Sequence, residues 1–162
     1  MHKLARPAVV AMAAFVGIAH AQGPHANRSA GIEAFGKGVQ IYTCQRARGN
    51  YVWTLKAPDA TISDAQGRVL GQHYAGPSWK AVDGSVVVGE PLEASSSPDS
   101  GAIPWLVLRA KSHYGNGMMA NVRYIVRMRT EGGRAPTNGC DAGQVGMEFR
   151  VPYSAVYVFY RN

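Results

Sequence analysis

From about residue 32 onward, hydrophobic and polar residues alternate in short runs that are separated by Gly, Pro, Asn and Asp. Runs rich in β-branched and aromatic residues with this period of two are typical of strands. They include "VQIYTC" (39–44), "YVWTLK" (51–56), "RVLGQHY" (68–74), "SVVVGE" (85–90), "IPWLVLRA" (103–110), "NVRYIVRMRT" (121–130) and "AVYVFY" (155–160). The stretches "RARGN", "DAQGR" and "VDGS" between them are typical of turns. The pattern predicts an all-β fold of roughly eight to ten short strands, either a single-domain β-sandwich or a closed β-barrel.

The longest stretch without Gly or Pro, "MMANVRYIVRMRTE" (118–131), fits two different periods. A helix would place four apolar residues on one stripe, namely Met118, Val122, Ile125 and Val126. A strand would place four apolar residues on one face, namely Val122, Tyr124, Val126 and Met128, opposite a face that carries Arg123, Arg127 and Arg129. We predict a strand whose three arginines form a solvated face.

The first 21 residues have the organisation of a secretory signal peptide. Lys3 and Arg6 precede the apolar run "AVVAMAAFVGIA" (8–19), which is too short to span a bilayer. Small residues in "AHA" (19–21) stand where a signal peptidase reads, so cleavage is predicted after Ala21. The expected organisation is a removed signal peptide (1–21), a flexible mature N-terminus (22–31) and a single β-domain (32–162). The mature chain is expected in the periplasm or outside the cell, with no membrane span.

Charge and cysteine content narrow the range of partners. The formal net charge of +7 falls to +5 once Lys3 and Arg6 are removed. So small an excess on an exported chain does not indicate nucleic acid as a partner. Cys44 and Cys140 both remain in the mature chain, and an even pair in an exported protein predicts a disulfide. A reactive thiol or a metal ligand is the alternative for each cysteine alone.

Candidate chemistry concentrates in "GQHYAGPSWKAVDGS" (71–85). His73 supplies an ionisable ring, Trp79 a stacking surface and Asp83 a carboxylate, so these three are the candidate ligand-binding residues. His73, Asp83 and Ser85 are also the residue types of a hydrolytic triad, but the chain contains no GxSxG elbow. "VDGS" is equally a turn whose polar side chains bond local amides. We interpret the stretch as a corner in which His73 ends a strand and Trp79 enters the core, and we predict no catalytic residue.

Metal and cofactor signals are weak. The mature chain has three histidines, His25, His73 and His113, and they show no HxH, HxxxH or HExxH spacing, so no metal site is predicted. "GNGMMA" (115–120) matches GxGxxA, yet a dinucleotide site needs a helix after this motif, and here a strand is predicted. We interpret it as a hairpin turn and predict no cofactor.

Aromatic residues give the strongest argument for binding. Trp53, Trp79 and Trp105, together with several tyrosines, are many rings for one β-domain. Rings on an open sheet or at a barrel mouth can stack on sugars or apolar ligands, with arginines contributing charge. The alternative interpretation buries most of these rings in the core.

Five blocks in a fixed order carry a resemblance to a known family. They are "GVQIYTC" (38–44), "HYAGPSW" with "DGS" (73–79 and 83–85), "IPWLVL" (103–108), "TEGGRAPTNGCD" (130–141) and "VPYSAVYVFY" (151–160). Together they resemble the secreted, uncharacterised family catalogued as domain of unknown function 3455, over about residues 32–160. The resemblance implies an exported single-domain protein of bacteria or fungi, with no agreed activity or cofactor and no site residues to transfer. Both cysteines fall inside matching blocks, which suits the disulfide.

The leading interpretation is an exported, disulfide-stapled, non-catalytic β-domain that binds a small molecule or an envelope component. One alternative is an exported enzyme, hydrolase-like or metal-dependent, that uses His73 and Asp83. Another is a purely structural envelope protein. The sequence leaves the oligomeric state open.

Overall fold

The computed structural model describes residues 31–161, which form eight antiparallel strands and no helix. The strands are β1 (Ile32–Ala47), β2 (Asn50–Ser63), β3 (Val69–Tyr74), β4 (Ser78–Ala81), β5 (Val86–Ser95), β6 (Trp105–Tyr114), β7 (Val122–Gly132) and β8 (Glu148–Arg161). The all-β prediction is confirmed. The short strand β4 is an element for which the sequence showed no run of its own.

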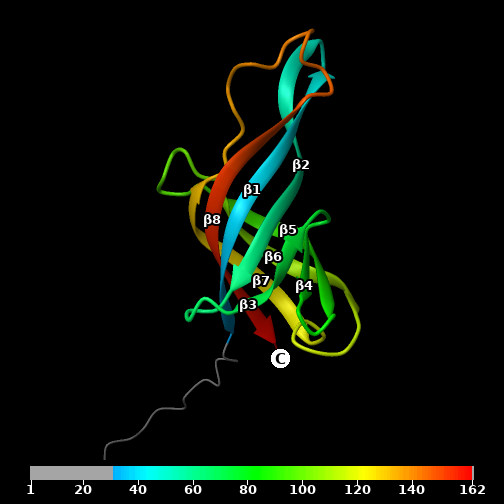
Figure 1. The fold of residues 1–162 in the computed structure, drawn as a ribbon, viewed down its shortest axis with the longest axis vertical. Coiled ribbons are helices and arrows are strands. Elements are labelled where there is room, and N and C mark those ends of the chain that lie inside the picture. Colours follow the sequence, from blue (N-terminus) through cyan, green and yellow to red (C-terminus); the bar gives the residue numbers. More distant parts are fainter. Residues whose placement is uncertain (1–30, 162) are drawn as a thin grey trace, which may run out of the picture.

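The strands pair in sequence order, and β8 returns to pair with β1, so the sheet closes into a barrel. Of the two architectures that the sequence left open, the structure has the closed sheet. Neighbouring strands are antiparallel and consecutive, so most connections are short turns. The longest strands, β1, β2 and β8, extend beyond the rest of the sheet as a finger, which Figure 1 shows at the top.

A disulfide between Cys44 and Cys140 fastens the loop 133–147 to this finger. The loop rises from the end of β7 to the tip of the finger before it enters β8 (Figure 1). Backbone hydrogen bonds join Cys44 to Met147 and Gly146, and the Trp53 indole Nε1 donates to the Asn138 carbonyl at 2.8 Å. The predicted disulfide is therefore confirmed, and it connects the first hairpin with the last third of the chain.

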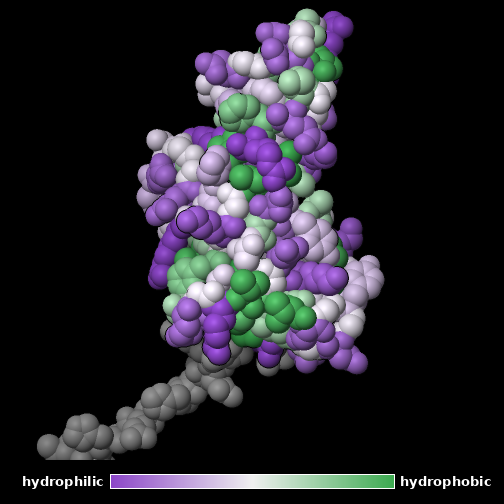
Figure 2. Space-filling model, viewed as in Figure 1, coloured by the Kyte–Doolittle hydropathy of each residue, from purple (hydrophilic) through white to green (hydrophobic). Residues whose placement is uncertain are grey.

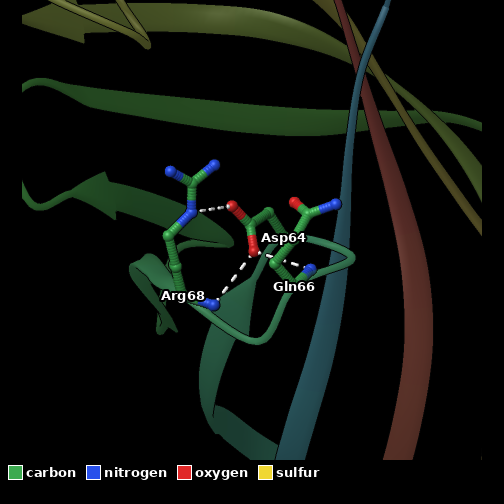
Figure 3. A network of polar contacts seen from close by, with 3 residues as sticks. All are labelled: Asp64, Gln66 and Arg68. Atoms are coloured by element: carbon green, nitrogen blue, oxygen red, sulfur yellow. Dashed lines mark hydrogen bonds and ion pairs between the residues drawn. The ribbon is translucent and has the colours of Figure 1, made fainter.

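The turn chemistry seen in the sequence closes the hairpins. In "DAQGR", the Asp64 carboxylate accepts hydrogen bonds from the backbone amides of Gln66 and Arg68 at 3.0 and 2.9 Å (Figure 3). Its second oxygen accepts from the Arg68 Nε at 2.7 Å. Gly67 in this turn has a φ of 79°, which a residue with a Cβ rarely adopts. These hydrogen bonds stabilise a tight turn, so a short connection joins β2 to β3.

The apolar core fills the inside of the closed sheet. It consists of buried side chains from most of the strands, among them Ile62, Trp79, Val87, Leu108, Val122, Ile125 and Phe159. Met119, on the loop between β6 and β7, is completely buried in the same cluster. "GNGMMA" is thus the connection of a hairpin, as predicted, and it also closes the sheet interior with an apolar side chain.

The strand predicted at 118–131 is present as β7, but its faces differ from the prediction. The pairing of β7 with β8 shifts register between Val122 and Tyr124, which is a β-bulge. Beyond a bulge the alternation reverses, so Ile125 is buried while Tyr124 is exposed. Arg127 lies on the same inward face as Ile125 and is half-buried. The prediction that the three arginines share one solvated face was wrong for this reason.

Several predictions concern residues outside the part of the chain that the structure describes. The signal peptide at 1–21 and the flexible segment at 22–31 lie outside it, apart from Gly31. Within residues 31–161, no helix is long and apolar enough to cross a membrane. Figure 2 shows a face that is largely hydrophilic, with a hydrophobic group on its lower half.

Candidate functional site

A cavity of about 330 Å³ opens into the closed sheet beside the turn between β3 and β4. Its lining residues come from six strands and that turn: Gln40, Leu55, Lys56, Ala57, Pro58, His73, Gly76, Pro77, Pro91, Leu106 and Arg127. Leu55 and Pro91 are exposed at the mouth, whereas Gln40 and His73 are buried deeper in it. Its volume is within the range of small-molecule sites, about 300–1,000 Å³.

His73 reaches the cavity from the end of β3, next to the corner that leads into β4. The imidazole is 2 % exposed and its Nδ1 is 2.9 Å from the Ser78 carbonyl oxygen. A carbonyl only accepts, so Nδ1 carries the proton and Nε2 is an acceptor. Burial lowers the pKa of His73 to about 4; the bond to Ser78 opposes this shift and the charge of Arg127 adds to it. The ring is therefore neutral at physiological pH.

Aromatic rings hold this imidazole in place. Trp79 stacks on it in parallel, with 4.3 Å between ring centroids and 6° between the planes. Tyr157 packs edge-on against it, with 5.2 Å between centroids. Because β3 and β4 pair His73 directly with Trp79, the corner itself creates the stack. Trp79 forms the layer behind His73 and is not among the residues that line the cavity.

Gln40 is the second buried polar residue of the cavity. It lies on β1, its side chain is 2 % exposed, and its Nε2 has no hydrogen-bond partner among residues 31–161. A buried donor that is left without an acceptor costs roughly 1–3 kcal/mol. Such a group needs an explanation, and a cavity wall is a place where a ligand can supply the acceptor.

Arg127 brings a positive charge to the inner face of β7. Its Nε and Nη2 both donate to the Pro104 carbonyl, at 3.1 and 2.8 Å. Burial lowers the pKa of the guanidinium, and the neighbouring phenols of Tyr157 and Tyr153 oppose that shift. Arginine nevertheless remains protonated in proteins. Within the described residues, no carboxylate forms an ion pair with Arg127.

Three tyrosines surround this part of the interior and are already bonded to neighbours. The Tyr42 hydroxyl donates to the Gly133 carbonyl at 2.6 Å, and the hydroxyls of Tyr153 and Tyr157 are 3.2 Å apart. Burial is the main cause that raises the pKa of each of these phenols. All three are therefore neutral, and they bring no negative charge to balance Arg127.

Asp83 lies away from the cavity, in the turn between β4 and β5. One carboxylate oxygen accepts from the Ser85 amide at 2.9 Å and from the Ser85 hydroxyl at 2.5 Å. The other accepts from the Met118 amide at 2.7 Å, and the Ser85 hydroxyl accepts from the Met119 amide at 3.0 Å. The Ser85 hydroxyl first, and then these two amides, lower the pKa of Asp83. We call this group the Asp83–Ser85 clasp.

The structure thus brings together two of the three candidate ligand-binding residues. His73 and Trp79 are stacked, whereas Asp83 and Ser85 bond each other and the loop after β6. The imidazole nitrogen that would face an aspartate in a triad is occupied by Ser78. The interpretation of 71–85 as a corner, with Trp79 in the core, is confirmed. Within residues 31–161, no three His, Cys, Asp or Glu side chains gather to hold a metal ion.

Sequence reasoning did not select Gln40, and it considered Arg127 only as one of three arginines, with Arg123 and Arg129, that contribute charge beside exposed rings. Gln40 follows Val39 in an apolar run, and its one signal is a polar side chain at an inward position of that strand. Arg127 was assigned to the solvated face, because a bulge leaves no mark in the alternation. Both residues were therefore identifiable only once the strands were in register.

These features define an all-β protein whose closed antiparallel sheet holds an aromatic core and a cavity whose largely apolar wall carries Gln40, His73 and Arg127. The family model described as protein of unknown function (DUF3455) matches residues 24–161. The chain belongs to this family, as its five sequence blocks indicated. No curated protein and no solved structure matches it.

Proposed function

We propose that the protein is an exported, non-catalytic binding module that takes a small, partly apolar molecule into the cavity beside His73. The observation that carries the proposal is the buried Gln40 amide, whose Nε2 has no partner within residues 31–161 and which lines the same cavity as His73. A ligand acceptor at that amide would remove the cost of the unpaired donor. Leucine, alanine and proline side chains form most of the remaining wall and suit an apolar body.

The composition of the wall favours binding over catalysis. Among the described residues, those that line the cavity include no serine, threonine, cysteine, aspartate or glutamate, so they offer no hydroxyl, thiol or carboxylate as a nucleophile or base. Lys56 is ion-paired with Glu148 at the rim. His73 is neutral, as a general base must be, but its Nδ1 is hydrogen-bonded to the Ser78 carbonyl. The Asp83 carboxylate is hydrogen-bonded within the clasp. An enzyme that uses His73 and Asp83 together would need a different arrangement of both.

Octanamide tests the proposal, because it has an apolar chain and a neutral head that can accept from Gln40. At about 0.4 kcal/mol for each of about ten non-hydrogen atoms, we expect a Kd of about 1 mM or tighter. The protein is expressed from the full chain in an oxidising compartment and titrated while NMR follows the Gln40 side-chain amide and the His73 ring. Saturable shifts at these two groups support the proposal. Absence of saturable shifts, or shifts confined to the finger, contradicts it.

A cavity-filling variant provides the matched comparison. Leu106→Trp places a larger side chain at an inward position that lines the cavity, and it should abolish the octanamide shifts. Leu92→Trp makes the same change at an exposed position of β5 outside the cavity and should leave them intact. Near-ultraviolet circular dichroism shows whether each variant is folded. Intact mass spectrometry of the same preparation tests export, which predicts a chain that begins at Gln22.

A further inference from the structure

The guanidinium of Arg127 is a cation inside the closed sheet for which the described residues provide no counter-charge. The ion pairs within residues 31–161 join other side chains, namely Lys56–Glu148, Arg68–Asp64, Arg109–Glu90 and Arg150–Asp59. Among the described residues the acceptors of Arg127 are neutral: the Pro104 carbonyl, through Nε and Nη2, and the phenol of Tyr157. A guanidinium has five N–H donors, so these contacts leave donors free to bind a further group.

The groups that face Arg127 do not balance its charge. Tyr42, Tyr153 and Tyr157 are protonated phenols, and His73 is a neutral imidazole. None of the acidic residues within 31–161 lines the cavity, and its other cation, Lys56, is already paired with Glu148. A partly buried charge without a partner is costly, because its interactions within the protein do not replace the hydration free energy that the charge loses on burial. The cavity is therefore an electropositive site with apolar walls.

Gln40 adds a second donor to the same cavity. Its Nε2 lacks an acceptor among the described residues, and its side chain is nearly completely buried. A carboxylate has two oxygens and accepts charge-assisted hydrogen bonds from guanidinium and amide donors at once. A neutral ligand can satisfy Gln40, but only an anion also satisfies Arg127.

We infer that the ligand is a small organic acid whose carboxylate binds Arg127 and the Gln40 amide, an inference that rests on the proposed function. Its apolar body lies against Leu106 and the prolines of the wall and points toward the mouth, where Leu55 is exposed. The inference names the class of ligand for the site that the proposed function describes. It also gives Arg127 a role as the residue that selects for negative charge.

The test compares octanoate with octanamide, which have the same apolar chain and heads of the same shape that differ in charge. Hydrogen bonds to a charged group contribute about 1.5–3 kcal/mol, so at pH 7.5 octanoate should bind about ten- to a hundredfold more tightly. Isothermal titration calorimetry in low salt measures both affinities, using the protein that is expressed from the full chain. In the unmodified protein, NMR should also show the Arg127 Nε–H resonance moving with octanoate.

Two arginines of the same strand provide matched variants. Arg127→Gln should abolish the preference for octanoate over octanamide. Arg123→Gln removes an equal charge from an exposed side chain of β7 and should retain the preference, which excludes a general effect of net charge. Thermal melts show whether both variants fold. If Arg127→Gln does not fold, the shift of the Arg127 Nε–H resonance in the unmodified protein decides the outcome.

The failure of this inference differs from the failure of the proposed function. If octanamide binds as tightly as octanoate, the cavity is a binding site but the carboxylate assignment is wrong. If octanoate is preferred and Arg127→Gln keeps that preference, the anion lies elsewhere and the role of Arg127 is refuted. If neither compound binds, both proposals fall.

Discussion

The imidazole of His73 lies flat on the indole of Trp79, with 4.3 Å between their centroids, and both side chains are almost completely buried. The two residues are directly opposite each other on β3 and β4, which pair at four positions. The corner at Gly76 and Pro77 joins the two strands. The stack therefore places an ionisable ring between the aromatic core on one side and the cavity on the other. A charge on that ring would be poorly solvated, which links protonation to stability.

We predict that stability depends on pH through His73. The ring titrates near pH 4 in the folded protein and near pH 6.5 when unfolded. As the pH falls from 6.5, the unfolded chain binds this proton first, so the contribution is fully present above pH 6.5 and is lost toward pH 4. The loss amounts to about 3 kcal/mol. Urea unfolding at several pH values, followed by tryptophan fluorescence, measures it.

His73→Phe is the comparison for this prediction, because it keeps a ring on Trp79 and removes the titration. The free energy of unfolding of the variant should change less than that of the unmodified protein between pH 6.5 and 4. Carboxylates that titrate below pH 5 contribute equally to both proteins and cancel. Parallel pH profiles, or a His73 NMR titration midpoint near 6.5, would show that the ring is not held neutral.

The Asp83–Ser85 clasp should stabilise the position of the loop 115–121, which covers the interior of the sheet with Met119. Ser85→Ala leaves the buried Met119 amide without its acceptor, which should cost about 1–3 kcal/mol. Hydrogen exchange at the Met118 and Met119 amides should accelerate more than exchange in the strands. Ser96→Ala, at an exposed position, should change stability by less than about 0.5 kcal/mol. Unchanged exchange at both methionines would mean that the core holds the loop without the clasp.

The sequence predicted the positions of the strands well, but it predicted less well which side chains point into the closed sheet. Alternation located seven of the eight strands because each has a run of its own, whereas β4 is only four residues long and merges with the corner around it. Closure of the sheet depends on the pairing of β1 with β8, a contact between opposite ends of the chain that no local pattern encodes.

The site was predictable only in part. His73 and Trp79 were found because both lie in one short stretch, and the pairing within a corner brings neighbours in sequence together. Asp83 lies in that stretch too, but its side chain is captured by the nearest amides, as short polar side chains in turns often are. Gln40 and Arg127 come from distant strands, so they meet at the cavity only through register and a bulge.

The disulfide should stabilise the finger more than the rest of the sheet. The loop between Cys44 and Cys140 spans 96 positions of sequence, for which chain entropy gives about 4–5 kcal/mol, an upper figure in practice. Cys44→Ala with Cys140→Ala should therefore unfold at lower urea concentration. Hydrogen exchange should increase mainly in 133–147 and at the tip of the hairpin of β1 and β2. An unchanged urea midpoint would show that packing such as Trp53 against Phe149 holds the finger alone.

Gly71 is expected to be required for the His73–Trp79 stack. A Cβ at Gly71 would overlap the Lys80 carbonyl oxygen and lie 2.9 Å from the Ala81 Cα, both of them backbone atoms that cannot rotate away. Gly71→Ala must therefore push β3 from β4, two positions before the pair that carries the stack. We expect a loss of about 1–3 kcal/mol in the free energy of unfolding and a change in the near-ultraviolet circular dichroism of Trp79.

Gly101→Ala is the matched control, since a Cβ there would meet only the Asp99 side chain at 3.4 Å. It should shift stability by less than about 0.5 kcal/mol and leave the tryptophan signal unchanged. If Gly71→Ala behaved like Gly101→Ala, the two strands would have room to separate, and the stack would not depend on their close approach. A selective effect of Gly71→Ala would show that a missing side chain in β3 positions the ring that borders the cavity.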